Sequence, residues 1–318
     1  MRILAGDIGG TKTILRASGD DGEAIERRYD SGGHPTFDDL LAEFLALVDG
    51  PVDAACFAVA GPVIAGRGDV TNLSWVIEAK SLAAKFPIGT VSIINDFHAV
   101  ALGVPLLGAD DLHPLHAGER VKEAPIAILG AGTGLGEAFV TFAGDAWTVI
   151  PSEGGHADFA PQDEVQARLY VELHERFGHV SWERLVSGHG LVNIFTFLGG
   201  DEIDPARVAE LANEGDPRAL DAMRILVDVY GAEAGNMALR VLARGGVFLA
   251  GGVAAKNVRF FTDGRFIEAF VRKGRFRELL ETIPVDLITN ERVGLLGAAE
   301  LARRTAARHV ESNSTPRR

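Results

Sequence analysis

Two glycine-rich turns, each set between apolar runs, constrain this chain more than any other feature. In residues 126–142 glycine recurs at every second position, at Gly130, Gly132, Gly134 and Gly136. Residues 3–18 repeat this plan around Gly6, Gly9 and Gly10. Glycine permits positive φ and carries no side chain, so successive N–H groups are free to converge on one anion. We therefore predict two β-hairpins, on two lobes, whose turns bind one polyphosphate.

Known phosphate-binding motifs do not account for these turns. The P-loop pattern G-x-x-x-x-G-K-[ST] occurs nowhere in the chain. The dinucleotide pattern G-x-G-x-x-G also fails, because Leu135 or Glu137 stands where its last glycine is required. A dinucleotide-binding turn opens a helix, whereas both turns here lead into strand-like runs. The alternative is a pair of tight hairpins without a ligand, since glycine clusters commonly mark turns.

Composition narrows the class of protein. The chain has 318 residues, of which 47% are hydrophobic, enough for two domains with a large core. Its formal net charge of −13 argues against nucleic acid or an anionic membrane as a partner. No apolar run reaches the roughly 18 residues of a membrane span, and Asp7 interrupts the first apolar run too early for a signal peptide. We expect a cytoplasmic enzyme.

The single cysteine, Cys56, lies in the apolar run 54–60. This setting predicts a buried core residue rather than a nucleophile. One cysteine also excludes a disulfide within the chain and a Cys-rich zinc site.

Two aspartates stand at ends of predicted strands. Asp7 lies beside the first glycine turn, where a carboxylate is a candidate partner for Mg²⁺, directly or through water; the alternative is a turn-capping aspartate. Asp96 stands where the predicted strand 90–94 gives way to a helix. Open α/β sheets bind ligands at such positions, although aspartate is also a common helix N-cap there.

Three further segments carry candidate ligands for a polyhydroxylated molecule. Glu153 and His156 flank two glycines; the E-x-x-H spacing suggests a metal, but no second His or Cys nearby completes a zinc site. Asn72 lies in the polar loop 71–75, which is equally consistent with an ordinary surface loop. Glu183 follows Ser181, a predicted N-cap, and the helix dipole alone favours an acid there.

The remaining patterns predict the framework. We expect helices over 36–48, 97–107, 163–177, 217–241 and 294–310, and buried strands over 53–60, 90–94 and 246–249. A third glycine turn follows the last strand. Gly231 and Gly235 inside the long helix require another backbone to pack closely. Residues 106–123 are predicted to be an irregular crossing segment with His113 and His116 on the surface, and 311–318 a disordered tail.

Seven of these segments, in order, resemble the bacterial glucokinase family, which comprises ATP-dependent relatives of hexokinase on the actin-like ATPase fold. Each segment alone is weak evidence, but the ordered set is specific. The matching residues are 6–11, 71–75, 94–97, 129–137, 153–156, 183–184 with 187–188, and 250–252.

The resemblance implies a two-lobed α/β architecture, the actin-like ATPase or ribonuclease H-like fold, with a cleft between the lobes. The small lobe comprises residues 1–106 plus 297–318 and the large lobe residues 107–296. It further implies transfer of the γ-phosphoryl group from ATP, with Mg²⁺, to the 6-hydroxyl of D-glucose, by a homodimer.

The resemblance also assigns roles to individual residues. Asp96 is similar to the family's catalytic base, and Asp7 is the expected partner of Mg²⁺. The expected sugar ligands are Asn72, Asn95, Asp96, Glu153, His156 and Glu183. The expected nucleotide-binding residues are Gly6, Asp7, Ile8, Gly9, Gly10 and Thr11 in the first turn, Gly132, Thr133 and Gly134 in the second, and Gly251 and Gly252 near the nucleoside.

Two positions depart from the family pattern: Lys12 replaces a frequent Asn, and His98 replaces a common Glu. The related repressor/kinase (ROK) family carries a Cys-rich zinc motif that a chain with one cysteine cannot form. The remaining alternatives are a kinase for another hexose or an N-acetyl amino sugar, and a non-catalytic sugar-responsive regulator. The acidic charge speaks against a DNA-binding regulator.

Overall fold

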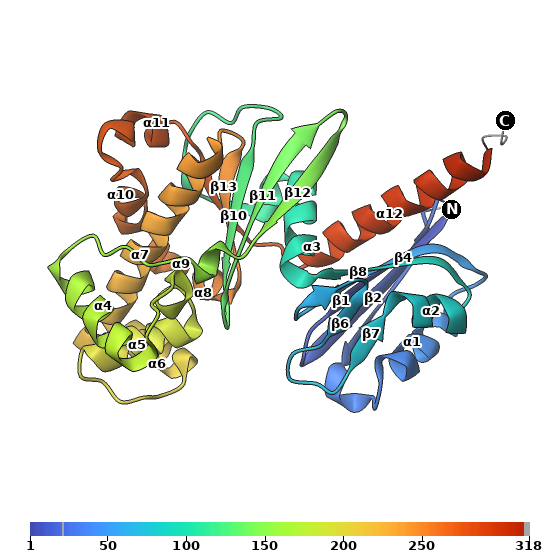
Figure 1. Ribbon diagram of the computed structural model, residues 1–318, viewed down its shortest axis with the longest axis horizontal. Helices are drawn as coiled ribbons and strands as arrows, with labels where there is room; N and C mark the ends of the chain where they lie inside the picture. Colours follow the sequence, from blue (N-terminus) through green and yellow to red (C-terminus); the bar gives the residue numbers. More distant parts are fainter. Residues whose placement is uncertain (21, 315–318) are drawn as a thin grey trace. The chain divides into compact units, whose positions relative to one another are not determined.

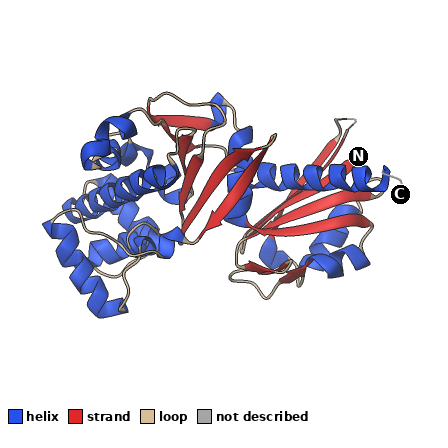
Figure 2. Cartoon of the chain, turned by 45° about the horizontal axis from the view of Figure 1, so that its top comes forward, coloured by secondary structure: helices blue, strands red, loops and turns tan. Residues whose placement is uncertain are grey.

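The computed structural model describes residues 1–20 and 22–314, and the chain divides into two compact units (Figure 1). Residues 1–107 and the segment from residue 290 onward form unit 1, and residues 108–289 form unit 2. The boundary expected at residue 297 falls inside helix α12 (Val293–Ser314), which belongs to unit 1. In each unit a sheet is covered by helices (Figure 2).

Unit 1 is built on a five-stranded mixed sheet of order β3-β2-β1-β4-β8. Strands β1, β4 and β8 run parallel to one another, and β2 and β3 extend the sheet in antiparallel fashion. The carboxyl ends of the three parallel strands therefore lie at one edge of the sheet. The strand bounds are Arg2–Ile8 (β1), Lys12–Gly19 (β2), Ala24–Asp30 (β3), Val52–Val59 (β4) and Ile88–Asn95 (β8).

Alternating side chains of these strands bury the two faces under different helices. One face packs under α1 (Phe37–Leu45), with Phe37 and Phe44 in the cluster that contains Phe57. The other face packs under α3 (Asp96–Gly103) and α12, with Cys56 among small residues. Cys56 is fully buried, which confirms the predicted core residue, and burial raises the pKa of its thiol to about 12.

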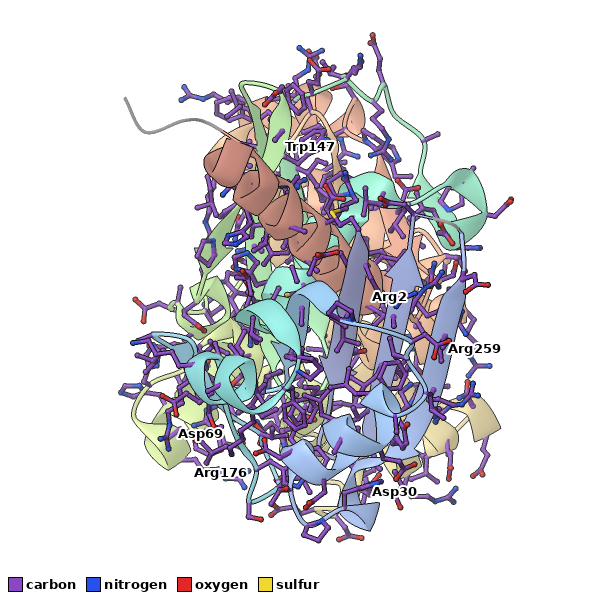
Figure 3. All side chains as sticks on the ribbon, turned by 90° about the vertical axis from the view of Figure 1, so that its right-hand side faces the viewer. Arg2, Asp30, Asp69, Trp147, Arg176 and Arg259 are labelled. Carbon is purple, nitrogen blue, oxygen red and sulfur yellow. The ribbon has the colours of Figure 1, made fainter. Side chains whose placement is uncertain are left out.

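Short elements complete unit 1. They are α2 (Ala79–Lys85), the small sheet of β5 (Val63–Ile64), β6 (Arg67–Asp69) and β7 (Val76–Glu78), and the 3₁₀ helices η1 (Ser31–Gly33) and η2 (Val104–Leu106). Asp30, labelled in Figure 3, caps η1 by accepting a hydrogen bond from the Gly32 amide. Thr36, the first residue of the predicted helix 36–48, is the N-cap of α1, because its hydroxyl accepts from the Asp39 amide at 3.2 Å.

Unit 2 repeats the strand plan of unit 1 and adds one strand, giving the order β12-β11-β10-β13-β14-β9. Strands β10, β13 and β14 are parallel, and β11 and β12 extend the sheet as an antiparallel meander. Phe142 and Trp147 stack edge to face near the β11–β12 turn; Trp147 is labelled in Figure 3. The bounds are Leu112–His116 (β9), Ile126–Ala131 (β10), Leu135–Ala143 (β11), Ala146–Ser152 (β12), Gly246–Ala250 (β13) and Val285–Ile288 (β14).

Strand β9 corrects the prediction of an irregular crossing segment over residues 106–123. It is an edge strand that pairs antiparallel with β14, with His113 opposite Leu287. His113 and His116 are half-buried rather than on the surface. The segment shows no alternation because it is short and contains Pro114, which a sheet accommodates mainly at an edge.

The helices of unit 2 surround the long helix α7 (Pro217–Val241), which has the bounds predicted for it and is capped by Asp216. Helix α5 had not been predicted; Ser187 caps it by accepting from the Gly190 amide. The other bounds are Glu164–Phe177 (α4), Gly188–Phe197 (α5), Pro205–Glu214 (α6), Gly252–Lys256 (α8), Val258–Phe261 (α9), Arg265–Val271 (α10) and Arg277–Glu281 (α11), with 3₁₀ helices Ala109–Asp111 (η3), Gly154–His156 (η4), Trp182–Arg184 (η5) and Gly274–Phe276 (η6).

Helix α12 extends further than expected. It includes residues 311–314, which the sequence had suggested were part of a disordered tail; residues 315–318 lie outside the described chain. None of the helices within residues 1–20 and 22–314 combines the length and apolarity that crossing a membrane requires.

The two glycines inside α7 are explained by helix α10. A Cβ at Gly231 would overlap the carbonyl oxygen of Phe266, and one at Gly235 would overlap that of Phe270. The predicted close approach of another backbone is thus confirmed. Small residues serve the same purpose in unit 1, where a Cβ at Gly297 of α12 would overlap the Ala99 carbonyl oxygen of α3.

We predict that Gly231→Ala lowers the free energy of unfolding by about 2 kcal/mol, because overpacking against backbone outweighs the better helix propensity of alanine. Urea unfolding measures the change. Asp221→Ala, an exposed position on the same helix, is the control and should stay within about 0.5 kcal/mol of the unaltered protein. Equal effects of the two substitutions would contradict the close packing of α7 on α10.

Candidate active site

The first glycine turn leaves two adjacent amides unengaged. The Gly9 amide donates to the Lys12 carbonyl at 3.0 Å and closes the β1–β2 hairpin. Within the described residues, the amides of Gly10 and Thr11 have no hydrogen-bond partner. The turn therefore presents two neighbouring N–H groups, which is the arrangement of an anion-binding nest.

Ser31 holds this turn from behind. It is fully buried, and its hydroxyl donates to the Gly9 carbonyl at 2.8 Å. The same hydroxyl shares a hydrogen bond of 2.9 Å with the hydroxyl of Thr13, and the Ser31 amide donates to the Thr11 carbonyl at 3.0 Å. Sequence reasoning missed Ser31, because it lies some twenty residues from the turn that it holds; the turn-forming run Asp30–Gly33 was the only local signal.

Asp7 and Asp96 follow parallel strands to the same edge of the unit 1 sheet. Asp7 lies near the end of β1, and Asp96 directly follows β8. Burial raises the pKa of Asp7 to about 6; the charge of Asp96 adds to this rise and that of Lys12 opposes it. Burial also raises the pKa of Asp96, against the hydrogen bonds that it accepts from Phe97 and Asn95. Two half-buried carboxyl groups thus influence one another beside the first turn.

Asn95, and not Asp96, is the N-cap of α3. Its Oδ1 accepts from the amides of Phe97 and His98 at 2.9 and 3.3 Å. Its Nδ2 donates to the Gly61 carbonyl at 3.1 Å and to Oδ1 of Asp96 at 2.9 Å. Asp96 is the first helical residue, and its Oδ1 also accepts from the Phe97 amide at 2.8 Å. Both of these hydrogen bonds end on Oδ1, and none of the side-chain hydrogen bonds in the described part of the chain ends on Oδ2, so one oxygen is fixed and the other is available.

The loop 71–75 packs against the first glycine turn. A Cβ at Gly10 would lie 2.6 Å from the Thr71 carbonyl oxygen, so only glycine fits there. Asn72 is exposed and has a φ of 65°. Trp75 is buried, and its indole donates to the His34 carbonyl at 3.3 Å. The anchored loop places an exposed asparagine next to the first turn.

The second glycine turn, in unit 2, is also held by backbone hydrogen bonds. The Gly132 amide donates to the Gly134 carbonyl, and the Gly188 amide donates to the Gly132 carbonyl, both at 2.8 Å. The Gly132 amide is thereby occupied, whereas those of Thr133 and Gly134 have no partner among the residues described. Like the first turn, the second presents two adjacent N–H groups.

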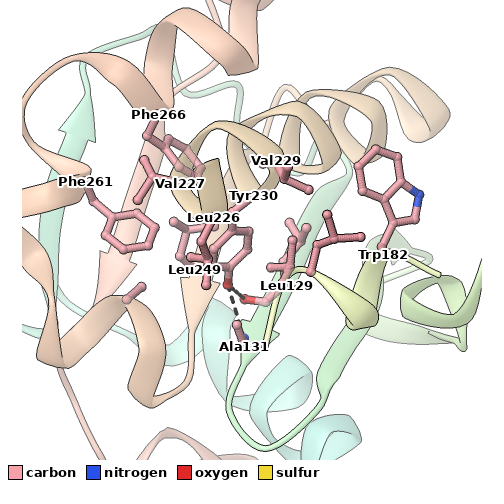
Figure 4. Close-up of a cluster of buried hydrophobic side chains, with 14 of the residues drawn as sticks. Leu129, Ala131, Trp182, Leu226, Val227, Val229, Tyr230, Leu249, Phe261 and Phe266 are labelled. Atoms are coloured by element: carbon pink, nitrogen blue, oxygen red, sulfur yellow. Dashed lines mark hydrogen bonds between the residues drawn. The ribbon is translucent and has the colours of Figure 1, made fainter. Parts of the chain in front are cut away.

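Behind this turn, Tyr230 of α7 fixes the end of β10 (Figure 4). Its hydroxyl donates to the Leu129 carbonyl at 3.4 Å and accepts from the Ala131 amide at 3.2 Å. A Cβ at Gly251, which has a φ of 85°, would overlap the Ala131 carbonyl oxygen. The third turn, at Gly251–Gly252, therefore packs against the base of the second.

Glu183 joins the second turn to the loop 153–156. Its Oε2 accepts from the Leu135 amide at 2.9 Å, and its Oε1 lies 3.8 Å from Nδ1 of His156. Glu153 and His156 are both exposed at the short helix η4. Ser181 occupies the N-cap position of η5, but its side chain makes no capping hydrogen bond. Unit 2 thus brings three of the predicted sugar ligands together.

The residues present fit Mg²⁺ better than a transition metal. No group of three or more His, Cys, Asp or Glu side chains within residues 1–20 and 22–314 forms a metal cluster. The carboxyl group of Asp7 offers hard oxygen ligands, and a cation there would relieve its repulsion with Asp96. Mg²⁺ is commonly held by one or two carboxylates together with phosphates and water.

Comparison with known sequences gives a consistent result. A family model described as Glucokinase matches residues 4–305. A relative named Glucokinase from Nostoc sp. is 42% identical, over 95% of this chain and 99% of the relative. One of the same name from Photorhabdus laumondii is 35% identical, over 94% of this chain and 96% of the relative.

Comparison with solved structures gives the same result as comparison with known sequences. A glucokinase from an Antarctic psychrotroph is 29% identical with a TM-score of 0.85, covering 95% of this chain and 99% of its own. A ROK family glucokinase from Streptomyces griseus, in complex with glucose and AMPPNP, is 21% identical with a TM-score of 0.62, covering 96% and 100%. The second similarity shows a shared fold.

We predict that in magnesium-free buffer Asp7 makes the protein less stable as the pH rises from about 4 to about 6. The pKa of Asp7 is raised from 3.8 to about 6, so the folded state binds the proton more tightly, and its contribution to stability is lost as the proton leaves. The loss is about 3 kcal/mol in total.

Urea unfolding of the unaltered protein and Asp7→Asn between pH 4 and pH 7 measures this loss. The difference in unfolding free energy between the two proteins should change most across pH 4–6 and level off by about pH 7. Parallel curves over the whole range would show that Asp7 is already ionised at pH 4.

Proposed function

The chain belongs to the glucokinase family and is an ATP-dependent hexose kinase, and on that premise we propose that it phosphorylates the 6-hydroxyl of D-glucose with Asp96 as the general base. The observation that carries this proposal is the hydrogen bonding of the Asp96 carboxylate. One of its carboxylate oxygens is held by Asn95 and the Phe97 amide, and the other is available for a hydroxyl group.

The phosphate groups of ATP would bind to the free amides of the two turns. Gly10 and Thr11 in unit 1, and Thr133 and Gly134 in unit 2, each supply two adjacent N–H donors. Such donors are already oriented, so binding requires little reorganisation of the protein. Gly251 and Gly252 would lie near the nucleoside.

The sugar would be oriented by hydrogen bonds from Glu153, His156 and Glu183, together with Asn72. Glu153 and His156 are exposed, and Glu183 is partly exposed and fixed by the Leu135 amide. The side-chain nitrogen and oxygen of Asn95 both already have hydrogen-bond partners. We therefore propose that Asn95 contributes to sugar binding in part by holding Asp96 in place.

In the proposed reaction the 6-oxygen attacks the γ-phosphorus, the bond to the leaving ADP oxygen breaks, and the hydroxyl proton passes to Oδ2 of Asp96. Phosphoryl transfer needs little covalent assistance, so positioning and charge stabilisation dominate. Burial raises the pKa of Asp96, which makes it a better proton acceptor. Asp7 would hold Mg²⁺, directly or through water; the ion supplies charge neutralisation of the phosphates when bound.

The same site geometry suits other hexoses and N-acetyl amino sugars, since their hydroxyl groups differ by small displacements. A coupled kinase assay with glucose, mannose, fructose and N-acetylglucosamine, each with ATP, ADP and polyphosphate, tests the choice of sugar and donor. Equal or faster turnover of another sugar would replace glucose in the proposal. The cytoplasmic location, the homodimer, the cleft and the assignment of units as catalytic lobes stay predictions.

We predict that Asp96→Asn lowers kcat by roughly 10²–10⁴-fold, the usual contribution of a general base, and leaves glucose binding largely intact. Steady-state assays measure kcat, and calorimetry measures the dissociation constant for glucose. Asp69→Asn, at an exposed acid of the same unit, should behave like the unaltered protein. Near-normal turnover of Asp96→Asn would remove Asp96 from the role of base.

We also predict that Ser31→Ala raises the KM for ATP roughly fivefold, because the Gly9 carbonyl loses a buried hydrogen bond of about 1 kcal/mol and the turn becomes less ordered. The KM for glucose should not change. Ser81→Ala, on helix α2 of the same unit, provides the control. A change confined to the KM for glucose would show that Ser31 does not act through the phosphate turn.

A further inference from the structure

A buried acid lies beneath the proposed sugar-binding loop and has no part in the chemistry described above. Glu137 belongs to strand β11, opposite Ser152 of β12. Its side chain is completely buried, with 0% exposure. Within the described chain, neither of its carboxyl oxygens has a hydrogen-bond partner. A buried polar group without a partner is costly, so its presence calls for a role.

The backbone of the loop 153–156 rests directly on this carboxyl group. A Cβ at Gly154 would overlap Oε2 of Glu137, so the two are in close contact. The Gly154 amide donates a hydrogen bond to the hydroxyl of Ser152 at 3.0 Å. Gly154 lies between Glu153 and His156, the two exposed candidate ligands for the sugar. The position of Glu137 therefore bears on the position of both ligands.

The charged groups that face Glu137 come mainly from helix α7. Arg240 lies 3.8 Å from Oε2 of Glu137 but makes its close contact with Glu233, which also accepts from Asn236 at 2.9 Å. Lys273, next to this group, donates to Asn236 and to the Ala232 carbonyl, both at 2.7 Å. The hydroxyl of Tyr230, also on α7, interacts with the charge of Glu137 as well, and Glu153 and His156 flank Gly154 on the loop.

In this arrangement the guanidinium group of Arg240 lies near two buried carboxyl groups, those of Glu137 and Glu233. Glu233 has the hydrogen bonds, and Glu137 has none. Burial raises the pKa of Glu137 to about 8, with the charge of Glu233 adding to the rise and that of Arg240 opposing it. Glu137 is accordingly the member of the pair that carries a proton at neutral pH, and a neutral carboxyl group can lie against the Gly154 backbone without an unpaired charge.

We propose that Glu137 is a positioning residue for the sugar-binding loop 153–156, that it supports the loop as a neutral acid, and that its ionisation loosens the loop. This inference rests on the proposed function of that loop. On losing its proton, the carboxylate would turn toward Arg240, where a closer approach forms a charged hydrogen bond. That movement withdraws Oε2 from Gly154 and removes the support beneath Glu153 and His156.

The first test is the pH dependence of the KM for glucose and for ATP. If only the protonated form holds the loop, about one molecule in eleven is competent one pH unit above the pKa. The KM for glucose should then rise about tenfold between pH 7 and pH 9, without a parallel rise for ATP or a matching fall in kcat. Glu137→Gln, a neutral isostere, should keep the neutral-pH KM for glucose up to pH 9.

Lys273 is the competing source of such a profile, because burial lowers its pKa to about 8. Glu137→Gln retains Lys273, so a rise in KM that persists in this variant belongs to another group and overturns the proposal. Lys273→Arg keeps a positive charge at all pH values tested and should preserve the rise. A flat profile in the unaltered protein would equally overturn the proposal, whether or not any variant folds.

The second test does not depend on activity. Because the pKa of Glu137 in the folded state lies near 8, above its ordinary value of 4.5, stability should fall as the pH rises between these values and level off above 8. The gain in Tm of Glu137→Gln over the unaltered protein should therefore grow from pH 5 to pH 8. An equal difference at both pH values would show that Glu137 is ionised throughout and would refute the proposal.

The two failures are distinguishable. If the proposed function is wrong, the unaltered protein shows no glucose-dependent consumption of ATP at any pH, while the Tm profiles still report the protonation of Glu137. If only the inference about Glu137 is wrong, the protein phosphorylates glucose, and Glu137→Gln matches it at every pH.

Discussion

Both glycine turns depend on hydrogen bonds made on their concealed side. In unit 1 the hydroxyl and amide of Ser31 bind the carbonyl groups of Gly9 and Thr11. In unit 2 the Gly188 amide binds the Gly132 carbonyl, and Tyr230 fixes the strand just before it. A peptide whose carbonyl is held in this way has its neighbouring N–H groups oriented before a ligand arrives. The cost of ordering these donors is met during folding rather than during binding.

The shared strand plan of the two units determines where the acidic groups lie. In each unit three parallel strands continue into an antiparallel hairpin, and the glycine turn joins the first parallel strand to that hairpin. Side chains that follow the parallel strands therefore reach the edge at which the turn lies. Asp7 and Asp96 meet in this way, although they are far apart in sequence.

Acids whose pKa values are raised by burial occur in both units, and each has a different environment. Asp96 is tied by hydrogen bonds on one oxygen, Glu233 is paired with Arg240, and Glu137 is left without a partner. Burial alone would penalise all three charges. Clusters of shifted carboxyl groups are frequent at functional sites, and here the differences in hydrogen bonding separate a proposed base, a structural ion pair and a proposed support for a loop.

The elements with strong local signals were predictable. The hairpins, the helix that begins at Asp216–Pro217, the buried run around Cys56 and the Thr36 cap follow from periodicity, glycine spacing and capping chemistry. The ordered set of motifs also indicated the family, which the comparisons confirm. Strand β9 and helix α5 were missed, because β9 is stabilised mainly by pairing with β14, and a glycine-rich start concealed α5.

The amino-acid sequence by itself determined which segments carry glycine turns, carboxylates and apolar faces, since these depend on residues close together in the chain. Tertiary structure alone decided how those groups are used. It made Asn95 the helix cap and left Asp96 one available carboxylate oxygen. It occupied the Gly132 amide but not those of Thr133 and Gly134, placed Ser31 behind a distant turn, and set Glu137 under Gly154. The reason is physical: hydrogen-bond partners, burial and the resulting pKa shifts arise from contacts between residues far apart in sequence, and no local pattern records them.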